Sequence, residues 1–341
     1  MRDTQLDIYR ALIMIYMICV IHPMYWLADG SEPYLSLVLL MEMPLVFFIS
    51  GASFSLSESR RGVWATCVNR FKRVAVPYYI YACVLLGFAA LITIAVRLTG
   101  VTAGQPLDLA KYDWKDVAAV LLAQDIPQFP FIWHLWFIPP YLILSCLFPL
   151  QVKLMRKTGR WLYAFACLLL FLVVRCLTHA SLLNQVLCYN IFMVSGYLFY
   201  KRVRPSTTML VGVTAFSALL VETLVLGMPF TPMQSHKFPP DGLFVSYHIF
   251  SLCLVAVVLG RFKLRECRIL TLWSQRGYNI YLYQSVAFTL LAIFRQHTPV
   301  YISHAVVRTM IDGVMVFLLL TLLSAFTYPL ERYVFKKLRL N

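Results

Sequence analysis

Residues 6–28 of the sequence, LDIYRALIMIYMICVIHPMYWLA, form one long apolar run. A run of about 20 apolar residues can cross the hydrocarbon core of a bilayer as an α-helix. The run nevertheless contains Arg10 and His22, and ionisable side chains are costly inside a membrane. It therefore predicts a first membrane-spanning helix. The two ionisable side chains within it call for a structural or functional explanation.

The composition of the whole chain supports this interpretation. The 341 residues are 60% hydrophobic and only 13% charged, although the net charge is +15. Soluble domains are about half apolar and about a quarter charged, and nucleic-acid-binding proteins are richer in charge. The composition excludes a soluble domain, and we expect no nucleic-acid partner. None of the nine cysteines forms a C-x-x-C pair, so we expect no metal site.

Ten apolar segments are predicted to span the membrane, in an all-α polytopic protein with a single domain over residues 1–341. Basic residues gather in every second connection, and 21 of the 30 Lys and Arg residues then fall on one side. Cytoplasmic loops carry such an excess, so we expect a plasma (inner) membrane protein with both termini in the cytoplasm. The predicted spans are residues 6–28, 36–56, 74–97, 131–152, 161–178, 184–200, 207–226, 243–260, 271–294 and 305–329.

The ionisable residues of the first span allow two interpretations. In one, Arg10 reaches the cytoplasmic interface and pairs with Asp7, while His22 ends the helix before Pro23. In the other, Arg10 and His22 both face a buried cavity, where Arg10 binds an anion and His22 acts as a base. Their separation of 12 residues corresponds to about 18 Å along a helix, which places His22 near the far end of the span.

Two further groups of polar residues lie near the ends of predicted spans. Arg70, Lys72 and Arg73 precede the third span, where they either set the topology or bind phosphate groups on the cytosolic side. His134 and Trp136 precede a tandem proline in the fourth span. A helix break inside a membrane is tolerated where protein or water covers the backbone, so a polar site near the external face is plausible.

The last polar residues lie later in the chain. Lys237 belongs to an external, proline-rich connection, KFPPD over residues 237–241, which either binds an anionic glycan or forms a rigid lid. In the ninth span, Asn279, Tyr283 and Gln284 lie at positions i, i+4 and i+5. These three side chains either form hydrogen bonds between helices or line a cavity.

Taken together, these segments resemble the membrane acyltransferase-3 family, whose members O-acylate saccharides and other acceptors. The resemblance extends over nearly the whole chain and rests on the order and spacing of short elements. These elements are Leu6–Asp7–x–x–Arg10 with His22, Phe47–Phe48–Ile49–Ser50–Gly51, Arg70–x–x–Arg73–x–x–x–Pro77, His134–Leu135–Trp136 up to Phe148–Pro149, Gly277–Tyr278–Asn279–Ile280–Tyr281 and Tyr328–Pro329–Leu330–Glu331.

The resemblance implies a membrane-bound O-acyltransferase that moves an acyl group from cytosolic acyl-CoA to an acceptor hydroxyl. We expect acetyl-CoA as the donor, a saccharide or lipid-linked glycan as the acceptor, and membrane lipids as the surroundings. The essential arginine and histidine of the family correspond to Arg10 and His22. The loop arginines correspond to Arg70 and Arg73, which with Lys72 are expected to hold the CoA phosphates.

The residue types fit this chemistry. An imidazole, whose pKa lies near the working pH, suits His22 to take the hydroxyl proton. No Ser or Cys nucleophile motif is present, so direct transfer and a transient acyl-histidine are both open. The oxyanion donor is expected among Asn279, Tyr281 and Trp136. The residues expected to bind substrate are Asp7, His134, Trp136, Lys237, Asn279, Tyr281 and Gln284.

The sequence departs from the family pattern at two points. The family usually has ten residues between the arginine and the histidine, and this chain has eleven, residues 11–21. At about 100° per residue, the usual spacing leaves the pair about 20° apart around the helix, and this spacing leaves it about 120° apart. A π-bulge absorbs one extra residue, so we predict one between Arg10 and His22. Gln284 replaces the late histidine and is expected to hydrogen-bond rather than titrate.

Two other classes of protein deserve comparison with an enzyme. A saccharide or lipid transporter, or a flippase, would move its cargo without covalent chemistry. Such proteins often contain internal repeats and paired broken helices, which the sequence does not show. A membrane sensor or assembly protein would leave Arg10 and His22 unexplained.

Overall fold

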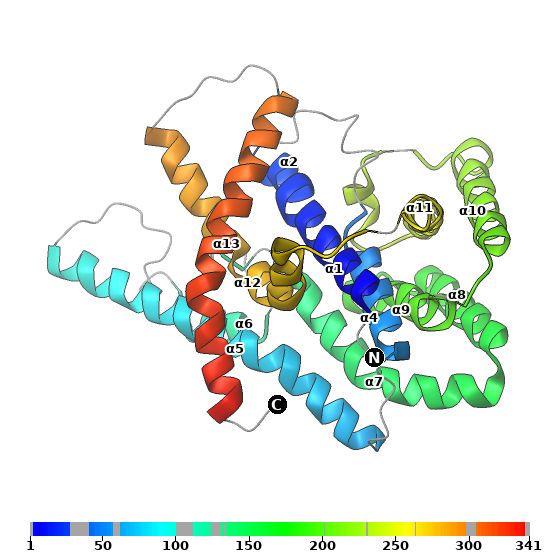
Figure 1. The fold of residues 1–341 in the computed structure, drawn as a ribbon, viewed down its shortest axis with the longest axis horizontal. Coiled ribbons are helices and arrows are strands. Elements are labelled where there is room, and N and C mark those ends of the chain that lie inside the picture. Colours follow the sequence, from blue (N-terminus) through cyan, green and yellow to red (C-terminus); the bar gives the residue numbers. More distant parts are fainter. Residues whose placement is uncertain are drawn as a thin grey trace.

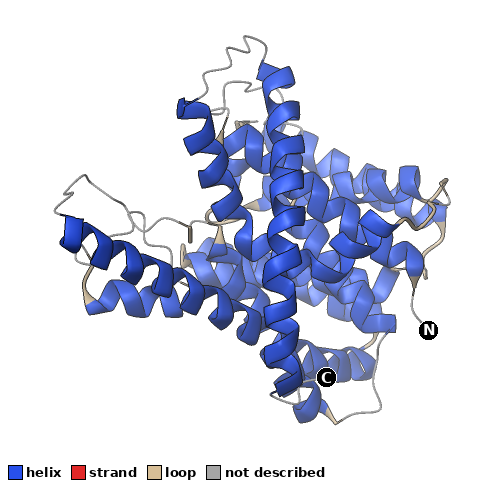
Figure 2. Ribbon diagram, turned by 60° about the vertical axis from the view of Figure 1, so that its left-hand side comes forward, coloured by secondary structure: helices blue, strands red, loops and turns tan. Residues whose placement is uncertain are grey.

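A computed structural model describes residues 3–27, 41–56, 62–99, 112–123, 131–132, 134–200, 202–229, 231–262, 264–297 and 305–337. Within these ranges the regular elements are helices, and no β-strand is present (Figure 1, Figure 2). The prediction of an all-α fold is therefore confirmed.

Each of the ten predicted spans has a helical counterpart. Eight helical segments of the described chain are long and apolar enough to cross a membrane. The other two counterparts are α4, which has 14 residues, and α12, which carries Ser274, Gln275 and Arg276. The predicted span 36–56 begins outside the described residues. The counterparts are α1–η1–α2 (Thr4–Trp26), α4 (Met43–Leu56), α5 (Val63–Thr99), α7 (Ile138–Thr158), α8 (Arg160–Leu177), α9 (Ser181–Phe199), α10 with η4 (Pro205–Val225), α11 (Gly242–Leu259), α12 (Arg268–His297) and α13 (Ala305–Lys337).

The outer helices expose apolar side chains, as a surface that faces lipid requires. Leu162 on α8 is 62% exposed and Leu210 on α10 is 66% exposed, and both have many apolar neighbours of the same kind. Soluble proteins rarely expose large contiguous apolar patches. The chain is thus an all-α polytopic membrane protein.

The first span crosses the centre of the molecule. In Figure 1, α1 and α2 lie between α12 and α13 on one side and α4 and α9 on the other. The N-terminal end of α1 and the C-terminal end of α13 lie toward the same side of the bundle, as an even number of spans requires (Figure 1, Figure 2). That this side is the cytoplasmic one stays a prediction.

The first span is one continuous helical segment that contains a π-helical turn. The turn, η1 (Met17–Ile21), lies between α1 (Thr4–Tyr16) and α2 (His22–Trp26). The backbone N–H of His22 donates to the carbonyl oxygen of Met17, five residues earlier. The predicted π-bulge between the arginine and the histidine is confirmed. His22 is 6% exposed, so the turn directs it into the protein rather than toward lipid.

A glycine of α13 lies against the π-helical turn. A Cβ atom on Gly313 would overlap with the carbonyl oxygen of Cys19 in η1. The absence of a side chain at this position therefore lets α13 touch the backbone of the turn, which fixes the turn from outside.

Glycines also bring α4 and α9 together. A Cβ atom on Gly51 would overlap with the carbonyl oxygen of Met193, and one on Gly196 would overlap with that of Phe48. Membrane helices associate through small residues because these let the backbones approach closely. This packing positions the start of α4 beside the first span.

Candidate functional site

Two cavities lie near opposite ends of the first span. The large cavity has a volume of about 770 Å³ and is lined by Asp7 and Arg10 of α1, among others. The small cavity has a volume of about 150 Å³ and lies at the C-terminal end of the span. Among the described residues that line them, Tyr281 is shared by both. The lining of the small cavity consists of Ile21, His22, Tyr25, Trp26, Glu42, His134, Trp136, Gln234, Lys237 and Tyr281.

His22 lies in the wall of the small cavity, between an amide and a carboxylate. Its Nδ1 atom is 2.6 Å from Oε1 of Gln284, and its Nε2 atom is 3.1 Å from Oε2 of Glu42. When Nδ1–H donates to Gln284, Nε2 faces the carboxylate and the cavity. The expectation that Gln284 hydrogen-bonds is met, and its partner is the histidine itself.

Glu42 and Lys237 form a buried ion pair beside His22. The Nζ atom of Lys237 bonds to Oε1 of Glu42, and it lies 4.4 Å from the centroid of the Trp136 ring. Lys237 is 3% exposed. Burial lowers the pKa of the Lys237 ammonium, and the adjoining carboxylate opposes that shift. Because the Lys237 ammonium is already paired with Glu42 inside the protein, the structure favours the rigid-lid interpretation of this connection over an anionic-glycan site at Lys237.

Glu42 is a functional candidate that the sequence patterns did not single out. It precedes α4 and is 3% exposed. A usable signal was present, because a carboxylate within the predicted span 36–56 is as costly as the arginine and histidine of the first span.

Two hydrogen bonds join the segment around His134 to the segment around Tyr281. The hydroxyl of Tyr281 donates to the carbonyl oxygen of His134 at 2.6 Å, and Nε2 of His134 donates to the carbonyl oxygen of Leu282 at 3.1 Å. The short helix η3 (Leu135–Phe137) follows His134 and leads into α7. The two bonds attach this turn to α12, so His134 and Trp136 reach the small cavity, as predicted for a polar site at this break.

Arg10 lines the large cavity and is already partnered there. It donates to Oδ1 of Asp7 at 2.7 Å and to Oγ of Ser53 at 2.8 Å. The pairing with Asp7 is the one expected from an interfacial arginine, yet all three side chains line the cavity. Arg10 and His22 therefore serve different cavities, and the interpretation in which they face one common cavity does not hold.

The loop arginines enter the large cavity from α5. Arg70 and Arg73 both line it, and the guanidinium carbon of Arg70 lies 4.4 Å from the centroid of the Phe54 ring. Lys72 is exposed and does not contribute to the lining. The structure thus brings together Arg10, Arg70 and Arg73, and it leaves Lys72 outside.

Asn279 belongs to the lining of neither cavity. Its Nδ2 donates to Oε2 of Glu331 at 3.0 Å, and its Oδ1 accepts from Oγ1 of Thr327 at 2.8 Å. Both partners belong to α13, so the interhelical alternative applies at Asn279. Glu331, from the last element of the resemblance, thus accepts a hydrogen bond from this amide.

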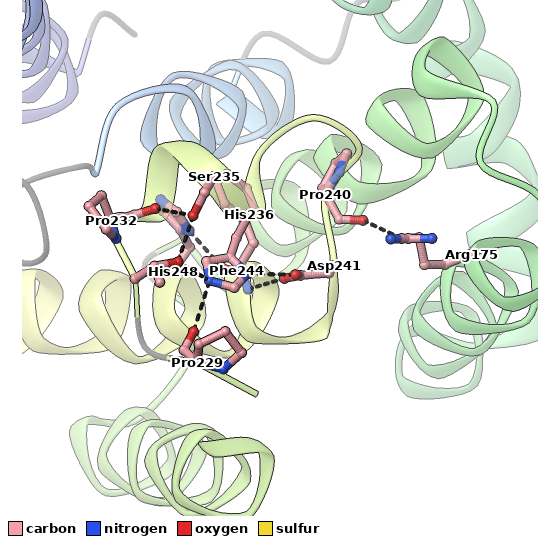
Figure 3. Close-up of polar contacts among 10 residues, drawn as sticks. Arg175, Pro229, Pro232, Ser235, His236, Pro240, Asp241, Phe244 and His248 are labelled. Carbon is pink, nitrogen blue, oxygen red and sulfur yellow. Dashed lines mark hydrogen bonds and ion pairs between the residues drawn. The ribbon is translucent and has the colours of Figure 1, made fainter. Parts of the chain in front are cut away.

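The connection between α10 and α11 carries Lys237, which lines the small cavity. Figure 3 shows the polar contacts that hold this connection, around His236 and Asp241. His236, at the end of η5 (Met233–His236), contacts Oδ2 of Asp241 through Nδ1 at 2.6 Å. Its Nε2 lies 3.2 Å from the carbonyl oxygen of Pro229. The Nδ1 atom faces the carboxylate of Asp241, and this hydrogen bond raises the pKa of His236.

We expect this connection to loosen as the pH rises. Because the pKa of His236 is raised on folding, its contribution is fully present below the unfolded value of about 6.5 and is lost as the pH passes the folded value. Hydrogen exchange of residues 231–241, corrected for the intrinsic rate, should quicken as the pH rises above about 6.5 and passes the raised pKa of His236. His236→Gln, which does not titrate, should abolish this dependence. Equal pH dependence in both chains would contradict the assignment.

No group of three or more His, Cys, Asp or Glu side chains suited to a metal ion is found among the described residues.

The comparison with family models gives one further finding. A model described as an acyltransferase domain matches residues 3–329, a range that includes every residue of both cavities. No curated protein and no solved structure matches the chain.

Proposed function

The chain belongs to the acyltransferase-3 family, and on this premise we propose that it transfers an acetyl group from acetyl-CoA to a hydroxyl of a lipid-linked or surface polysaccharide. Acyl transfer follows from the family, and the donor, the acetyl group and the acceptor belong to the proposal. The observation that supports it best is the pair of cavities that meet at Tyr281, one with three arginines and one with His22. This arrangement suits two substrates that arrive from opposite faces of a membrane.

We place the donor in the large cavity and assign that cavity to the cytoplasmic side. Its volume of about 770 Å³ lies within the range of about 300–1,000 Å³ that is usual for ligand sites. The guanidinium groups of Arg70 and Arg73 match phosphate groups in bidentate geometry. Arg10 lies on α1, where Asp7 and Ser53 orient it toward the same ligand.

We assign the chemical step to His22. The acceptor hydroxyl gives its proton to Nε2 of His22 while its oxygen bonds to the thioester carbonyl carbon. The carbon–sulfur bond then breaks, and the CoA sulfur takes the proton from the imidazolium, so the products are an O-acetyl ester and CoA. Gln284 holds the Nδ1–H tautomer, and the carboxylate of Glu42, 3.1 Å from Nε2, accepts a hydrogen bond from the N–H that forms there and so stabilises the imidazolium.

We assign the other residues that line the small cavity to binding of the acceptor. Trp136 presents an aromatic ring to the cavity, and His134 is fixed beside it. Of the three side chains expected as oxyanion donors, Trp136 lines this cavity and is retained for that role. Tyr281 lines it too, but its hydroxyl already donates to the carbonyl oxygen of His134, so it is left out. Asn279 is engaged with α13 and is left out.

Removing the arginines of α5 should weaken donor binding. A hydrogen bond to a charged group contributes about 1.5–3 kcal/mol, so Arg70→Ala or Arg73→Ala should raise the KM for acetyl-CoA by about 10- to 150-fold. The effect on kcat should be small, because His22 lies in the other cavity. Transfer of labelled acetyl groups from acetyl-CoA to isolated glycan measures both constants. Lys153→Ala, an exposed basic residue on α7, is the matched control.

Two outcomes would contradict the proposal. Unchanged KM values in the arginine variants would remove the donor from the large cavity. A wild-type chain that transfers no acetyl group, but whose loss stops glycan export from the cell, would favour the transporter alternative over the enzyme.

A further inference from the structure

We infer that Tyr281 is a specificity-determining residue that restricts the donor to short acyl groups. The inference rests on the proposed function and adds to it the residue that selects the acyl chain. It starts from the position of Tyr281 as the lining residue that the large and small cavities have in common.

Tyr281 forms a partition between the two cavities. Its side chain is 2% exposed, although it borders both spaces. The ring packs against three others, with centroid distances of 4.6 Å to Phe137, 5.3 Å to His134 and 6.4 Å to His22. A donor that reaches from the large cavity toward His22 must therefore bring its thioester to the face of this ring.

The partition is held in place by its hydroxyl group. The Tyr281 hydroxyl donates to the carbonyl oxygen of His134 at 2.6 Å, and both groups are buried. A buried hydrogen bond is costly to leave unmade, and the rings of His134 and Phe137 pack against the phenol as well. The ring is thus a fixed wall rather than a side chain that swings aside for a larger group.

The space beyond the partition sets the size limit. With the thioester carbonyl at His22, the acyl chain projects into the small cavity, whose volume is about 150 Å³. An apolar cavity of that volume accommodates one benzene molecule. An acetyl group and the attacking hydroxyl fill such a space together, and a longer chain would collide with the phenol. Truncating Tyr281 would widen the space between the large cavity and His22 and create room for that chain.

The experiment compares acetyl-, propionyl-, butyryl- and hexanoyl-CoA with the full chain in lipid nanodiscs. Competition against labelled acetyl-CoA reports binding, and transfer to glycan reports turnover. The wild-type chain should prefer acetyl-CoA over butyryl-CoA in both. Tyr281→Ala should shift the butyryl-to-acetyl ratio of binding and of kcat/KM at least tenfold toward butyryl. Tyr281→Phe, which keeps the ring, should retain the wild-type preference.

The outcomes separate this inference from the proposed function. An unchanged butyryl-to-acetyl ratio in Tyr281→Ala would overturn the inference, even if acetyl transfer is observed. Absence of transfer with every donor would overturn the proposed function, and the binding ratio would still decide whether Tyr281 selects the chain. Tyr281→Leu serves the same comparison should the alanine variant fold poorly, because it retains more of the buried volume.

Discussion

A chain with His22→Gln is expected to lose acyl transfer by a factor of about 10²–10⁴, the range that general base catalysis usually contributes. Glutamine can still bond to Gln284 and Glu42, but it cannot take a proton from the acceptor hydroxyl. The KM for acetyl-CoA should change little, because the arginines that we assign to the donor line the other cavity. Steady-state transfer of labelled acetyl groups to glycan gives both values.

The matched control is His179→Gln, which alters an exposed histidine near the end of α8. Its transfer rate should equal that of the wild-type chain at equal expression. Wild-type levels of acetylation in His22→Gln would remove His22 from the chemistry. If glycan export were lost while acetylation stayed unchanged, the chain would be a transporter.

The second large effect is expected at the buried ion pair. Glu42→Leu leaves the ammonium of Lys237 buried without its partner, and removing one member of a buried pair costs about 3–5 kcal/mol. Replacing both members by apolar residues of similar size is often neutral or stabilising. We therefore expect thermal unfolding in detergent to show a destabilised Glu42→Leu chain and a rescued Glu42→Leu/Lys237→Met chain.

The same double variant tests the role of Glu42 in catalysis. If Glu42 stabilises the imidazolium of His22, the double variant should transfer acetyl groups at least tenfold more slowly than the wild-type chain, even though its stability is restored. Its pH–rate profile should also differ from the wild-type profile, which a purely structural role would not produce. A double variant with full activity and the wild-type profile would make the carboxylate a structural element alone.

The spans were predictable from sequence because a helix that crosses the bilayer needs about 20 consecutive apolar residues, and such a run can be recognised in the sequence. The π-helical turn was predictable for a different reason. Eleven residues lie between Arg10 and His22, one more than the family usually has, so a regular helix would point the two side chains in different directions. A π-helical turn, which takes up one extra residue, is the simplest remedy. Both inferences depend on local, periodic information that a single segment contains.

The polar partners were not predictable in the same way. Glu42 and Lys237 are 195 residues apart in the chain, and no periodicity connects them. Asn279 and Tyr281 lie two positions apart on one helix, yet one faces α13 and the other both cavities. The direction of each side chain depends on which helices pack around α12, and that is a property of the tertiary structure.

The π-helical turn at Met17–Ile21 also has an evolutionary meaning. An insertion into a regular helix rotates everything that follows by about 100° and advances it by about 1.5 Å. A π-helical turn takes up one residue more than an α-helical turn, so the segment beyond it has the orientation that a regular helix one residue shorter would give it. A membrane helix can in this way tolerate a change in length at its centre while the chemistry at its end is inherited intact.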